Sequence, residues 1–403
     1  MKIAFVTFGC RLNRAESLDL ESRYRAAGHE IIDLGAVPKT GGTSFCSSAI
    51  PDLILVRGCS VTAKAQRDCE KAIAHLRNRF STADIQILGC LPNANPELTT
   101  YNSQLTTYNS QLTTHTPIIP TATSRAYLKI QDGCNGKCTF CIVPHFRGPS
   151  RSVPFDEITA RMKSFLAAGY REIVLTGCNL ALYRSNEYDL ASLLSTLAKM
   201  RYNVRIRLSS LEPTRICGAI IESMAAHPNI CRFIHLSLQS GSDRVLKLMK
   251  RPYNVEQVDR FCTAARELLG PDLALGADII TGFPGETDED FAATREFLVR
   301  HAFSNFHVFP YSERPGTPAA TMDGSLPRAV RLARAKELTA LGRRQREAFS
   351  QTFLNREVEV CVEHGGEHGW TDSYLPCKWK GPAERRSLVR KRIVAISGDQ
   401  LLA

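Results

Sequence analysis

Three cysteines stand close together in the stretch AYLKIQDGCNGKCTFCIVPHFRGPSR, at the spacing C-x3-C-x2-C: Cys134, Cys138 and Cys141. The apolar–polar run before them predicts a strand at 127–130, so the thiols would lie on the loop that follows it. Three thiolates on one loop can bind three irons of a cubane cluster and leave the fourth iron without a local protein ligand. An open coordination position is what a metal centre needs to activate a substrate or cofactor.

The spacing alone leaves other uses for these thiols open. A zinc ion would need a fourth ligand, and His145 is near enough in the sequence to supply one. The three side chains could also be unrelated core thiols, because cysteine is often buried. The residues by themselves therefore indicate a metal centre without choosing between iron–sulfur and zinc.

Three further cysteines each follow a glycine at the end of an apolar run. They are Cys10, Cys59 and Cys90, after the runs at 2–8, 52–56 and 85–88. Ligand sites of parallel α/β sheets gather at the carboxyl ends of the strands, so these thiols could converge although they are far apart in sequence. Such a triplet favours a second metal cluster over chance recurrence of buried cysteines, whereas Cys46 and Cys69 are assigned to no site.

The composition is that of an ordinary globular protein with surplus positive charge. The 403 residues are 43% hydrophobic and 23% charged, with a net charge of +11, which suits two or three domains and favours an anionic macromolecular partner. No secretory signal and no apolar run long enough to span a membrane is visible. We therefore expect a cytoplasmic protein in which thiols bind metal instead of forming disulfides, although the chain has 14 cysteines.

The alternation of patterns divides the chain into parts. Residues 1–97 predict an open parallel α/β domain, with helices at 15–27 and 62–80 between the strands. Residues 98–124 carry no charged side chain and contain the repeat TTYNSQL-TTYNSQL, which is typical of a linker.

A second α/β region covers 125–353. The strands expected there are at 127–130, 173–176, 204–209, 233–238, 273–280 and 305–309. The clearest helical patterns are at 155–168, 255–269 and 288–301. Six strand–helix units are too few for a complete eight-stranded barrel, so we expect a partial (β/α)6 barrel whose polar loops at the carboxyl ends of the strands form a cofactor pocket.

The last part of the chain is basic. A helix at 327–353 carries seven basic residues: Arg328, Arg331, Arg334, Lys336, Arg343, Arg344 and Arg346. Residues 354–403 predict a small β-rich domain, with basic side chains between 385 and 392 near Trp370, Tyr374 and Trp379. Positive charge beside aromatic rings suits contact with RNA, although a solvated basic helix and ordinary core aromatics would give the same patterns.

The cysteine motifs resemble those of a known family. The first loop, including Phe140 before its last cysteine, is similar to the signature of radical S-adenosylmethionine (SAM) enzymes. TFGCRLNRAES, GCSVTAKAQ and LGCLPN resemble the three cysteine motifs of the methylthiotransferases within that group. Two departures are an apparent loop insertion at 38–48 and Arg57-Gly58, where the family usually has Asn-Thr.

The resemblance implies two 4Fe-4S clusters, one on Cys134, Cys138 and Cys141 and a second on Cys10, Cys59 and Cys90. In the family, SAM chelates the open iron of the first cluster, and its reductive cleavage gives a radical that abstracts hydrogen. The second cluster supplies or carries the sulfur. The residues that would contact SAM are Phe140, Thr176, Gly177, Asn179, Glu212, Gln239 and Ser240. The β-rich end resembles the TRAM domain, which binds RNA.

Three segments are most similar to the corresponding segments of family members that act on tRNA N6-threonylcarbamoyladenosine. They are KIQDGCNGKCTFCIVPHFRGPSRS, HLSLQSGSD and HVFPYSERPGTPAA. The implied reaction is methylthiolation at C2 of that nucleoside, with two SAM molecules. The implied partners are tRNA, a sulfur donor and an electron donor such as flavodoxin or ferredoxin. Alternatives are action on isopentenyladenosine or on a ribosomal protein aspartate, or a non-catalytic iron–sulfur protein that binds RNA.

Overall fold

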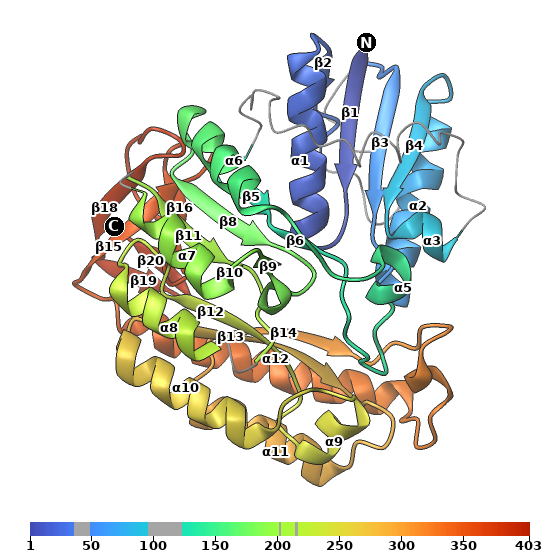
Figure 1. The fold of residues 1–403 in the computed structure, drawn as a ribbon, viewed down its shortest axis with the longest axis vertical. Helices are drawn as coiled ribbons and strands as arrows, with labels where there is room; N and C mark the ends of the chain where they lie inside the picture. Colours follow the sequence, from blue (N-terminus) through green and yellow to red (C-terminus); the bar gives the residue numbers. More distant parts are fainter. Residues whose placement is uncertain (36–48, 96–122, 201–202, 214–216) are drawn as a thin grey trace. The chain divides into compact units, whose positions relative to one another are not determined.

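The structure is a computed structural model that describes residues 1–35, 49–95, 123–200, 203–213 and 217–403 (Figure 1). The apparent loop insertion at 38–48 lies outside the described residues, as does the expected linker except for Thr123 and Ser124. The chain forms two compact units. The first unit is Met1–Thr121 with Ile142–Gly148, and the second is Ala122–Cys141 with Pro149–Ala403.

The first unit is the expected open parallel sheet. Its strands are β1 (Lys2–Thr7), β2 (Glu30–Ile32), β3 (Leu53–Gly58) and β4 (Asp84–Gly89), in the order β2-β1-β3-β4. Its helices are α1 (Arg11–Ala26), α2 (Ala63–Arg79), α3 (Leu91–Ala94) and α5 (Val143–Arg147). Thr62 caps α2 by accepting a hydrogen bond from the Ala65 amide at 3.1 Å. The short β2 and the inclusion of α5 in this unit were not predicted.

The strands of the first unit present apolar side chains on both faces, as buried parallel strands do. Ile73 and Leu76 of α2 pack with Ile54 and Val56 on one face of the sheet. On the other face, Tyr24 of α1 packs against the core formed by the alternate residues of β1 and β3. Covering both faces leaves the carboxyl edge of the strands as the place where polar and thiol side chains gather.

The second unit begins with the partial barrel. Its strands are β5 (Ala126–Lys129), β8 (Glu172–Thr176), β11 (Arg205–Leu208), β12 (Phe233–Gln239), β13 (Ala274–Thr281) and β14 (Asn305–Pro310). They form two parallel sheets, β11-β8-β5 and β12-β13-β14. Isolated parallel bridges at Ile206–Ile230 and Leu211–Leu236 connect the two sheets. All six expected strands are present within one or two residues, and β5 and β14 are the end strands.

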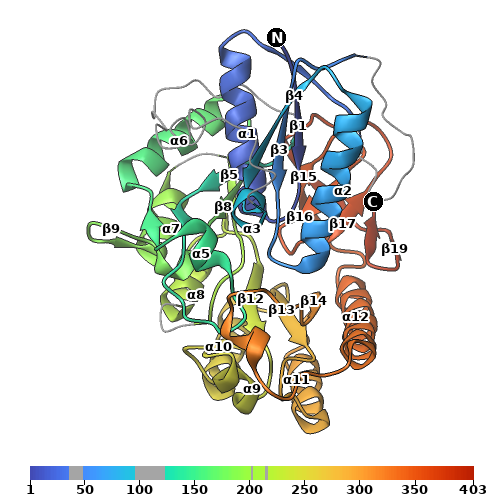
Figure 2. The ribbon, with the colours of Figure 1, turned by 90° about the vertical axis from the view of Figure 1, so that its right-hand side faces the viewer.

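Helices cover the outer side of the barrel strands, and α10, α11 and α12 run along β12, β13 and β14 (Figures 1 and 2). These helices are α6 (Phe155–Ala167), α7 (Leu190–Lys199), α8 (Cys217–Ala226), α9 (Asp243–Leu248), α10 (Val255–Leu269), α11 (Asp288–Arg300) and α12 (Arg328–Gln351). Short elements in the loops are β6 (Gln131–Asp132), β7 (Arg151–Ser152), β9 (Arg184–Ser185), β10 (Tyr188–Asp189), η2 (Leu180–Leu182) and η3 (Pro318–Thr321). Among the helices described, none combines the length and apolarity that crossing a membrane requires.

The C-terminal part of the second unit is a six-stranded sheet. It consists of β15 (Glu357–Val362), β16 (His368–Thr371), β17 (Pro376–Lys378), β18 (Leu388–Arg392), β19 (Ala395–Ser397) and β20 (Gln400–Leu402), in the order β18-β15-β16-β17-β20-β19. Trp379 is 4% exposed and packs with Val360, Ile393 and Leu401, so this ring belongs to the core. Of the two interpretations that the sequence left open for the aromatic rings, the one as an ordinary core aromatic therefore holds for Trp379, because a small sheet needs large rings for its core.

A buried ionic cluster joins the barrel to the C-terminal sheet. Glu172 of β8 pairs with Arg205 and Arg207 of β11, at 2.6 and 2.8 Å, and all three side chains are at most 3% exposed. The arginines also donate to backbone carbonyls of the C-terminal part: Arg205 to Glu359 and Trp370, and Arg207 to Thr371 and Asp372. Each buried charge in the cluster has a partner, so removing one partner would leave an uncompensated charge in the core.

We expect Glu172→Gln to lower the free energy of unfolding by about 3–5 kcal/mol, because it leaves two buried guanidinium groups without their carboxylate. Urea denaturation at neutral pH measures the change. The matched control is Glu256→Gln, which breaks an exposed pair with Arg260 and should cost less than about 1 kcal/mol. Equal losses in the two variants would contradict the assigned role.

The pH dependence of this difference has a definite sign. Burial by itself raises the pKa of Glu172, but Arg205, Arg207 and Arg125 outweigh burial and hold the pKa well below its ordinary range. The carboxylate therefore contributes its full stability above the pKa of an unfolded glutamate, about 4.3. The gap between wild type and Glu172→Gln should shrink as the pH falls below that value, and a gap that widens in acid would contradict this account.

Candidate metal centres

The loop that carries Cys134, Cys138 and Cys141 follows β6 and has almost no regular secondary structure, so contacts from other elements fix its shape. Thr139 donates its amide to the Met249 carbonyl at 3.1 Å and its hydroxyl to the Leu248 carbonyl at 3.0 Å, both at the end of α9. The Thr139 carbonyl accepts the Ala319 amide of η3 at 2.9 Å. The middle of the loop is therefore held from two sides.

Hydrogen-bond donors already point at two of the three sulfurs. The Gly136 amide donates to Cys134 Sγ at 3.3 Å, and Arg251 Nη1 donates to Cys138 Sγ at 3.0 Å. Such donors stabilise thiolates and tune the potential of a cluster that the thiolates bind. Burial raises the pKa of Cys134, with smaller contributions from Glu212 and Cys138. Partly buried thiols on one loop, with donors aimed at sulfur, fit a 4Fe-4S cluster.

Arg251 connects this loop to two of the residues expected to contact SAM. Its guanidinium pairs with Glu212 at 2.8 Å, and the other oxygen of Glu212 accepts from Asn179 Nδ2 at 2.8 Å. The Asn179 side chain also hydrogen-bonds the Cys134 thiol. The structure thus brings Cys134, Cys138, Asn179 and Glu212 together through Arg251, a residue that the sequence analysis missed because an isolated arginine after a helix gives no periodic signal.

Thr176 and Gly177, at the end of β8, lie against Gln131 just before the cysteine loop. A side chain at Gly177 would come within 2.8 Å of Gln131 Oε1, so glycine is required there. Gln131 in turn accepts the Asn179 amide at 2.9 Å and donates to the Gly133 carbonyl at 2.7 Å. Thr176 is 1% exposed. The contacts with Gln131 therefore set the distance between the loop after β8 and the cysteine loop. A role of Thr176 and Gly177 in binding SAM stays a prediction.

The other expected contact residues fall into different surroundings. Ser240 is buried, and its hydroxyl lies 3.2 Å from that of Thr294 in α11, while Gln239 has a positive φ of 68° at the end of β12. Phe140 packs edge-on against Phe283 at a ring distance of 6.4 Å, within a small apolar cluster that includes Met249 and Tyr311. Phe140 therefore anchors the cysteine loop on this apolar cluster. A contact between Phe140 and SAM stays a prediction.

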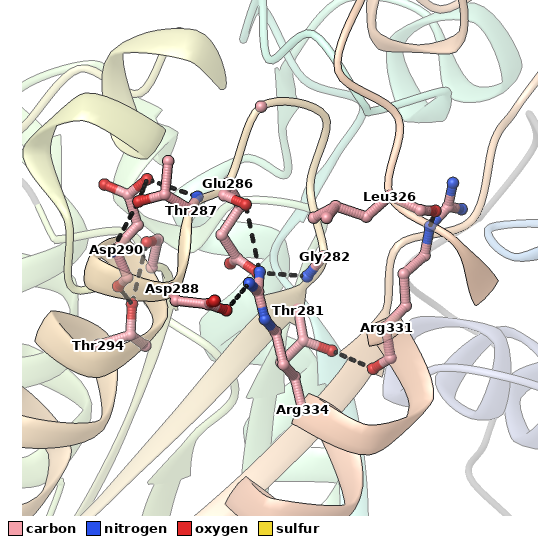
Figure 3. A network of polar contacts seen from close by, with 12 residues as sticks. Thr281, Gly282, Glu286, Thr287, Asp288, Asp290, Thr294, Leu326, Arg331 and Arg334 are labelled. Atoms are coloured by element: carbon pink, nitrogen blue, oxygen red, sulfur yellow. Dashed lines mark hydrogen bonds and ion pairs between the residues drawn. The ribbon is translucent and has the colours of Figure 1, made fainter. Parts of the chain in front are cut away.

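A polar network locks α12 to the loop after β13 (Figure 3). Glu286 accepts from the Gly282 amide at 2.7 Å and pairs with Arg334, which also reaches Asp288 at 2.6 Å. Burial raises the pKa of Glu286. A side chain at Gly282, where φ is +69°, would meet Arg331 at 2.4 Å. The glycine and the two arginines therefore fix this loop beside the barrel.

The same contacts correct one expectation for the basic helix. Arg331, Arg334 and Arg346 form internal ion pairs with Glu313, Glu286 and Asp399, respectively, so they serve packing. The other four basic residues of α12 are exposed: Arg328, Lys336, Arg343 and Arg344. Helical periodicity cannot distinguish the two groups, because both occupy polar positions in the sequence.

In the first unit, Cys10, Cys59 and Cys90 follow β1, β3 and β4 at the carboxyl edge of the sheet. Burial raises the pKa of Cys59 to about 12, and the proximity of Cys10 and Cys90 adds to this effect. Asn13 Nδ2 donates to the Phe8 and Gly58 carbonyls, at 2.9 and 3.1 Å, and so ties the turns before Cys10 and Cys59 together. The structure therefore brings together three thiols that the sequence separates by up to 80 residues.

Cations and a fourth thiol surround this second set. Arg147 of α5 hydrogen-bonds Cys90, and it also contacts Asn13 at 2.8 Å and Glu16 at 3.1 Å. Arg57 pairs with Glu16 at 2.7 Å, so the unusual Arg57 retains a polar network beside Cys59. Cys69, which the sequence analysis assigned to no site, accepts the Cys59 amide at 3.3 Å through its sulfur. This donor set fits an anionic iron–sulfur cluster.

Two family models match the chain. Residues 128–298 match the Radical SAM superfamily, and residues 2–107 match Uncharacterized protein family UPF0004. Among solved structures, the radical SAM methyltransferase TsrM from Kitasatospora setae is similar with a TM-score of 0.55 and 16% identity, over 79% of this chain and 77% of that one. This likeness concerns the fold alone.

Curated relatives cover nearly the whole chain. Proteins named threonylcarbamoyladenosine tRNA methylthiotransferase MtaB from Rickettsia prowazekii and Bacillus subtilis are both 32% identical, over 93% and 94% of this chain and 90% of each relative. A protein from Thermobifida fusca named tRNA-2-methylthio-N(6)-dimethylallyladenosine synthase is also 32% identical, over 89% of this chain and 77% of its own length.

We expect the thiols of the metal-free first unit to differ strongly in reactivity. Cys10 is exposed, whereas Cys59 is buried with a pKa of about 12. At pH 8 the thiolate fraction of Cys59 is on the order of a thousandfold below that of an ordinary cysteine. A short pulse of iodoacetamide, read by peptide mass spectrometry, should label Cys10 and leave Cys59 unlabelled. Urea-unfolded protein is the control and should label at both; equal labelling in the folded protein would contradict the geometry.

Proposed function

Because the chain belongs to the radical SAM methylthiotransferase family, we propose that it inserts a methylthio group at C2 of N6-threonylcarbamoyladenosine, beside the anticodon of tRNA. The observation that carries this proposal is the likeness, over nine-tenths of the chain, to relatives named for that reaction. The two sets of three cysteines support it, since the reaction needs both a radical source and a sulfur carrier.

Each set of cysteines would hold one 4Fe-4S cluster. Cys134, Cys138 and Cys141 would bind the cluster that chelates SAM, and Cys10, Cys59 and Cys90 would bind the second. When bound, these groups and two SAM molecules supply the electron, the hydrogen-abstracting radical, the methyl group and the sulfur. The C2–H group of the adenine ring is too weakly acidic for a side-chain base to remove its proton, which accounts for the use of such cofactors.

The protein's own side chains would position these groups. Arg251 places a positive charge against Cys138 and fixes Glu212, whose second oxygen holds Asn179. Glu212 and Asn179 are therefore held in place by contacts within the protein, which would lower the entropic cost of binding SAM. Thr176, Gly177, Gln239, Ser240 and Phe140 would complete the walls of that site.

The tRNA would contact exposed basic residues of the second unit. Candidates are Arg328, Lys336, Arg343 and Arg344 on α12 and Arg390 and Arg392 on β18. On β18 the charges are partly offset, because Arg390 and Arg392 stand opposite Glu359 and Glu357 of β15. The reaction would take place in the cytoplasm and would also need a sulfur donor and an electron donor such as flavodoxin or ferredoxin.

A second candidate substrate is N6-dimethylallyladenosine in tRNA, because a relative named for that product is equally identical to the chain. Both substrates would use the same clusters. A non-catalytic iron–sulfur protein is a third possibility, and it would release no 5′-deoxyadenosine from SAM under reducing conditions.

Mass spectrometry of nucleosides from tRNA should identify the substrate. Deleting the gene should abolish the 2-methylthio form of N6-threonylcarbamoyladenosine and let the unthiolated nucleoside accumulate, and a plasmid copy should restore it. The dimethylallyl nucleosides in the same digest are the internal control. Loss of their methylthio form instead would replace the proposed substrate with the second candidate.

The two cysteine sets should separate into two activities. Cys138→Ala should abolish both 5′-deoxyadenosine release and methylthiolation, because the first set is then incomplete. Cys10→Ala should keep 5′-deoxyadenosine release and lose methylthiolation. Iron and sulfide content should fall by half in each variant. Residual SAM cleavage in Cys138→Ala would refute the first assignment, and tRNA methylthiolation by Cys10→Ala would refute the second.

A further inference from the structure

The inner face of the end strand β14 carries two side chains that the fold leaves exposed. Phe306 packs against Gly342 of α12, where an added Cβ would meet its ring at 2.7 Å, so Phe306 faces the outer helix. Side chains alternate along a strand, so His307 and Phe309 face the opposite way, into the barrel. The His307 side chain is 47% exposed and Phe309 is 42% exposed.

His307 is one of three residues that converge on a single carboxylate oxygen. Asp278 Oδ1 lies 2.9 Å from His235 Nε2 and 3.0 Å from His307 Nδ1, and the two imidazole rings are 4.4 Å apart. The three residues come from the neighbouring strands β12, β13 and β14. Within the part of the chain that the structure describes, they are the one group of three His, Cys, Asp or Glu residues whose ligand atoms all lie within 4.8 Å of one another.

The backbone makes room for this arrangement. His235 pairs in register with Gly276 of β13, and a Cβ at Gly276 would come within 2.4 Å of His235 Nδ1 and 3.0 Å of the Asn305 carbonyl. Only glycine therefore lets the 1%-exposed His235 lie flat across β13 and reach Asp278. The position of the buried His235 imidazole thus depends on a glycine in the neighbouring strand, so the fold itself accommodates this group of three residues.

The carboxylate determines how His307 is presented. Burial by itself raises the pKa of Asp278, but His235 and His307 outweigh burial and hold the pKa well below its ordinary range. Asp278 is therefore ionised and accepts N–H from both rings. This orients His307 with Nδ1–H toward Asp278 and Nε2 toward the exposed side of the ring.

The trio faces the same space as the cysteine loop. Ile280, two residues beyond Asp278 on the same face of β13, packs in the apolar cluster that contains Phe140. The backbone carbonyl of Ser237, two residues beyond His235, accepts a hydrogen bond from Arg251, which also donates to Cys138. Two residues along a strand are about 6.6 Å. The trio thus lies one side-chain layer below the residues that hold the SAM-binding loop.

We propose that His307, oriented by Asp278 and His235, binds the carboxylate of the N6 substituent on the target adenosine. The inference rests on the proposed function and names the residue that selects the substrate. Threonylcarbamoyl carries a carboxylate, which can accept a hydrogen bond from Nε2–H of His307 while Nδ1–H stays on Asp278. A dimethylallyl group offers no acceptor and would leave this polar group unpaired, which a site built for hydrogen bonding discriminates against. Phe309, on the same face, offers a ring on which the base can stack.

Binding and turnover of two RNA stem-loops, one with N6-threonylcarbamoyladenosine and one with N6-dimethylallyladenosine, test the inference. We expect His307→Leu in the cluster-loaded full chain to reduce the preference for the threonylcarbamoyl RNA, in Kd from fluorescence anisotropy and in kcat/KM, by about tenfold to a hundredfold. Asp278→Asn should reduce it less, because the amide still accepts a hydrogen bond. His307→Gln should restore part of the preference, since its amide can donate to the carboxylate.

The matched control is His301→Leu. His301 is also paired with an aspartate, Asp259, at 2.9 Å, but it caps α11 on the outer side of the barrel. That variant should keep both the preference and 5′-deoxyadenosine release without RNA. The iron and sulfide content of every variant should equal that of the wild type, which would show that the clusters are intact.

Three results would overturn the inference. An unchanged preference in His307→Leu, with wild type still choosing the threonylcarbamoyl RNA, would refute the role of His307 and leave the proposed function standing. A wild-type preference for the dimethylallyl RNA would refute both. Stoichiometric zinc or manganese in the wild type that is lost in His307→Leu would show that the trio binds a metal ion instead.

Discussion

The arrangement of this protein depends on holding three thiols in a fixed geometry on a loop that has almost no regular secondary structure of its own. Contacts with other elements fix this geometry. Thr139 is hydrogen-bonded to the end of α9 and to η3, Phe140 packs into an apolar cluster, and Arg251 donates a hydrogen bond to Cys138. Every one of these partners comes from a part of the chain more than 100 residues further on. The thiols are therefore positioned by contacts that exist only in the closed barrel, which makes the site a product of the whole fold.

The basic surplus of the chain is used in two distinct ways. Arg205 and Arg207 neutralise Glu172 and bond to carbonyls of the C-terminal sheet. Arg334 ties α12 to the loop after β13, and Arg331 ties it to the Tyr311 carbonyl just after β14. These charges are internal and cannot attract RNA. The tRNA contact that we propose would rest on the exposed basic residues of α12 and β18, so the electrostatic attraction would be smaller than the net charge suggests. Inside the barrel, His307 is an exposed polar group that faces the space where the substrate would bind.

The sequence predicted the course of the chain closely. The structure places all six barrel strands within one or two residues of the ranges expected, which were 127–130, 173–176, 204–209, 233–238, 273–280 and 305–309. The prediction succeeded because buried parallel strands appear in a sequence as continuous apolar runs between glycines and polar loops. The helix expected at 62–80 and the edge position of Cys10, Cys59 and Cys90 followed from the same local rules. The short strands β2, β6 and β9 were missed, since two or three residues carry no measurable period.

The sequence by itself determined the α/β alternation, the two cysteine sets and the resemblance to a family, because each depends on spacing along the chain. Only the tertiary structure decided which side chains meet across it: Arg251 with Cys138, Arg147 with Cys90, and His235, Asp278 and His307 on one oxygen. It also decided that Trp379 is core and that Arg331 and Arg334 are internal. The reason is physical: burial and pairing are set by strand order, register and helix packing, which join residues that no local pattern relates.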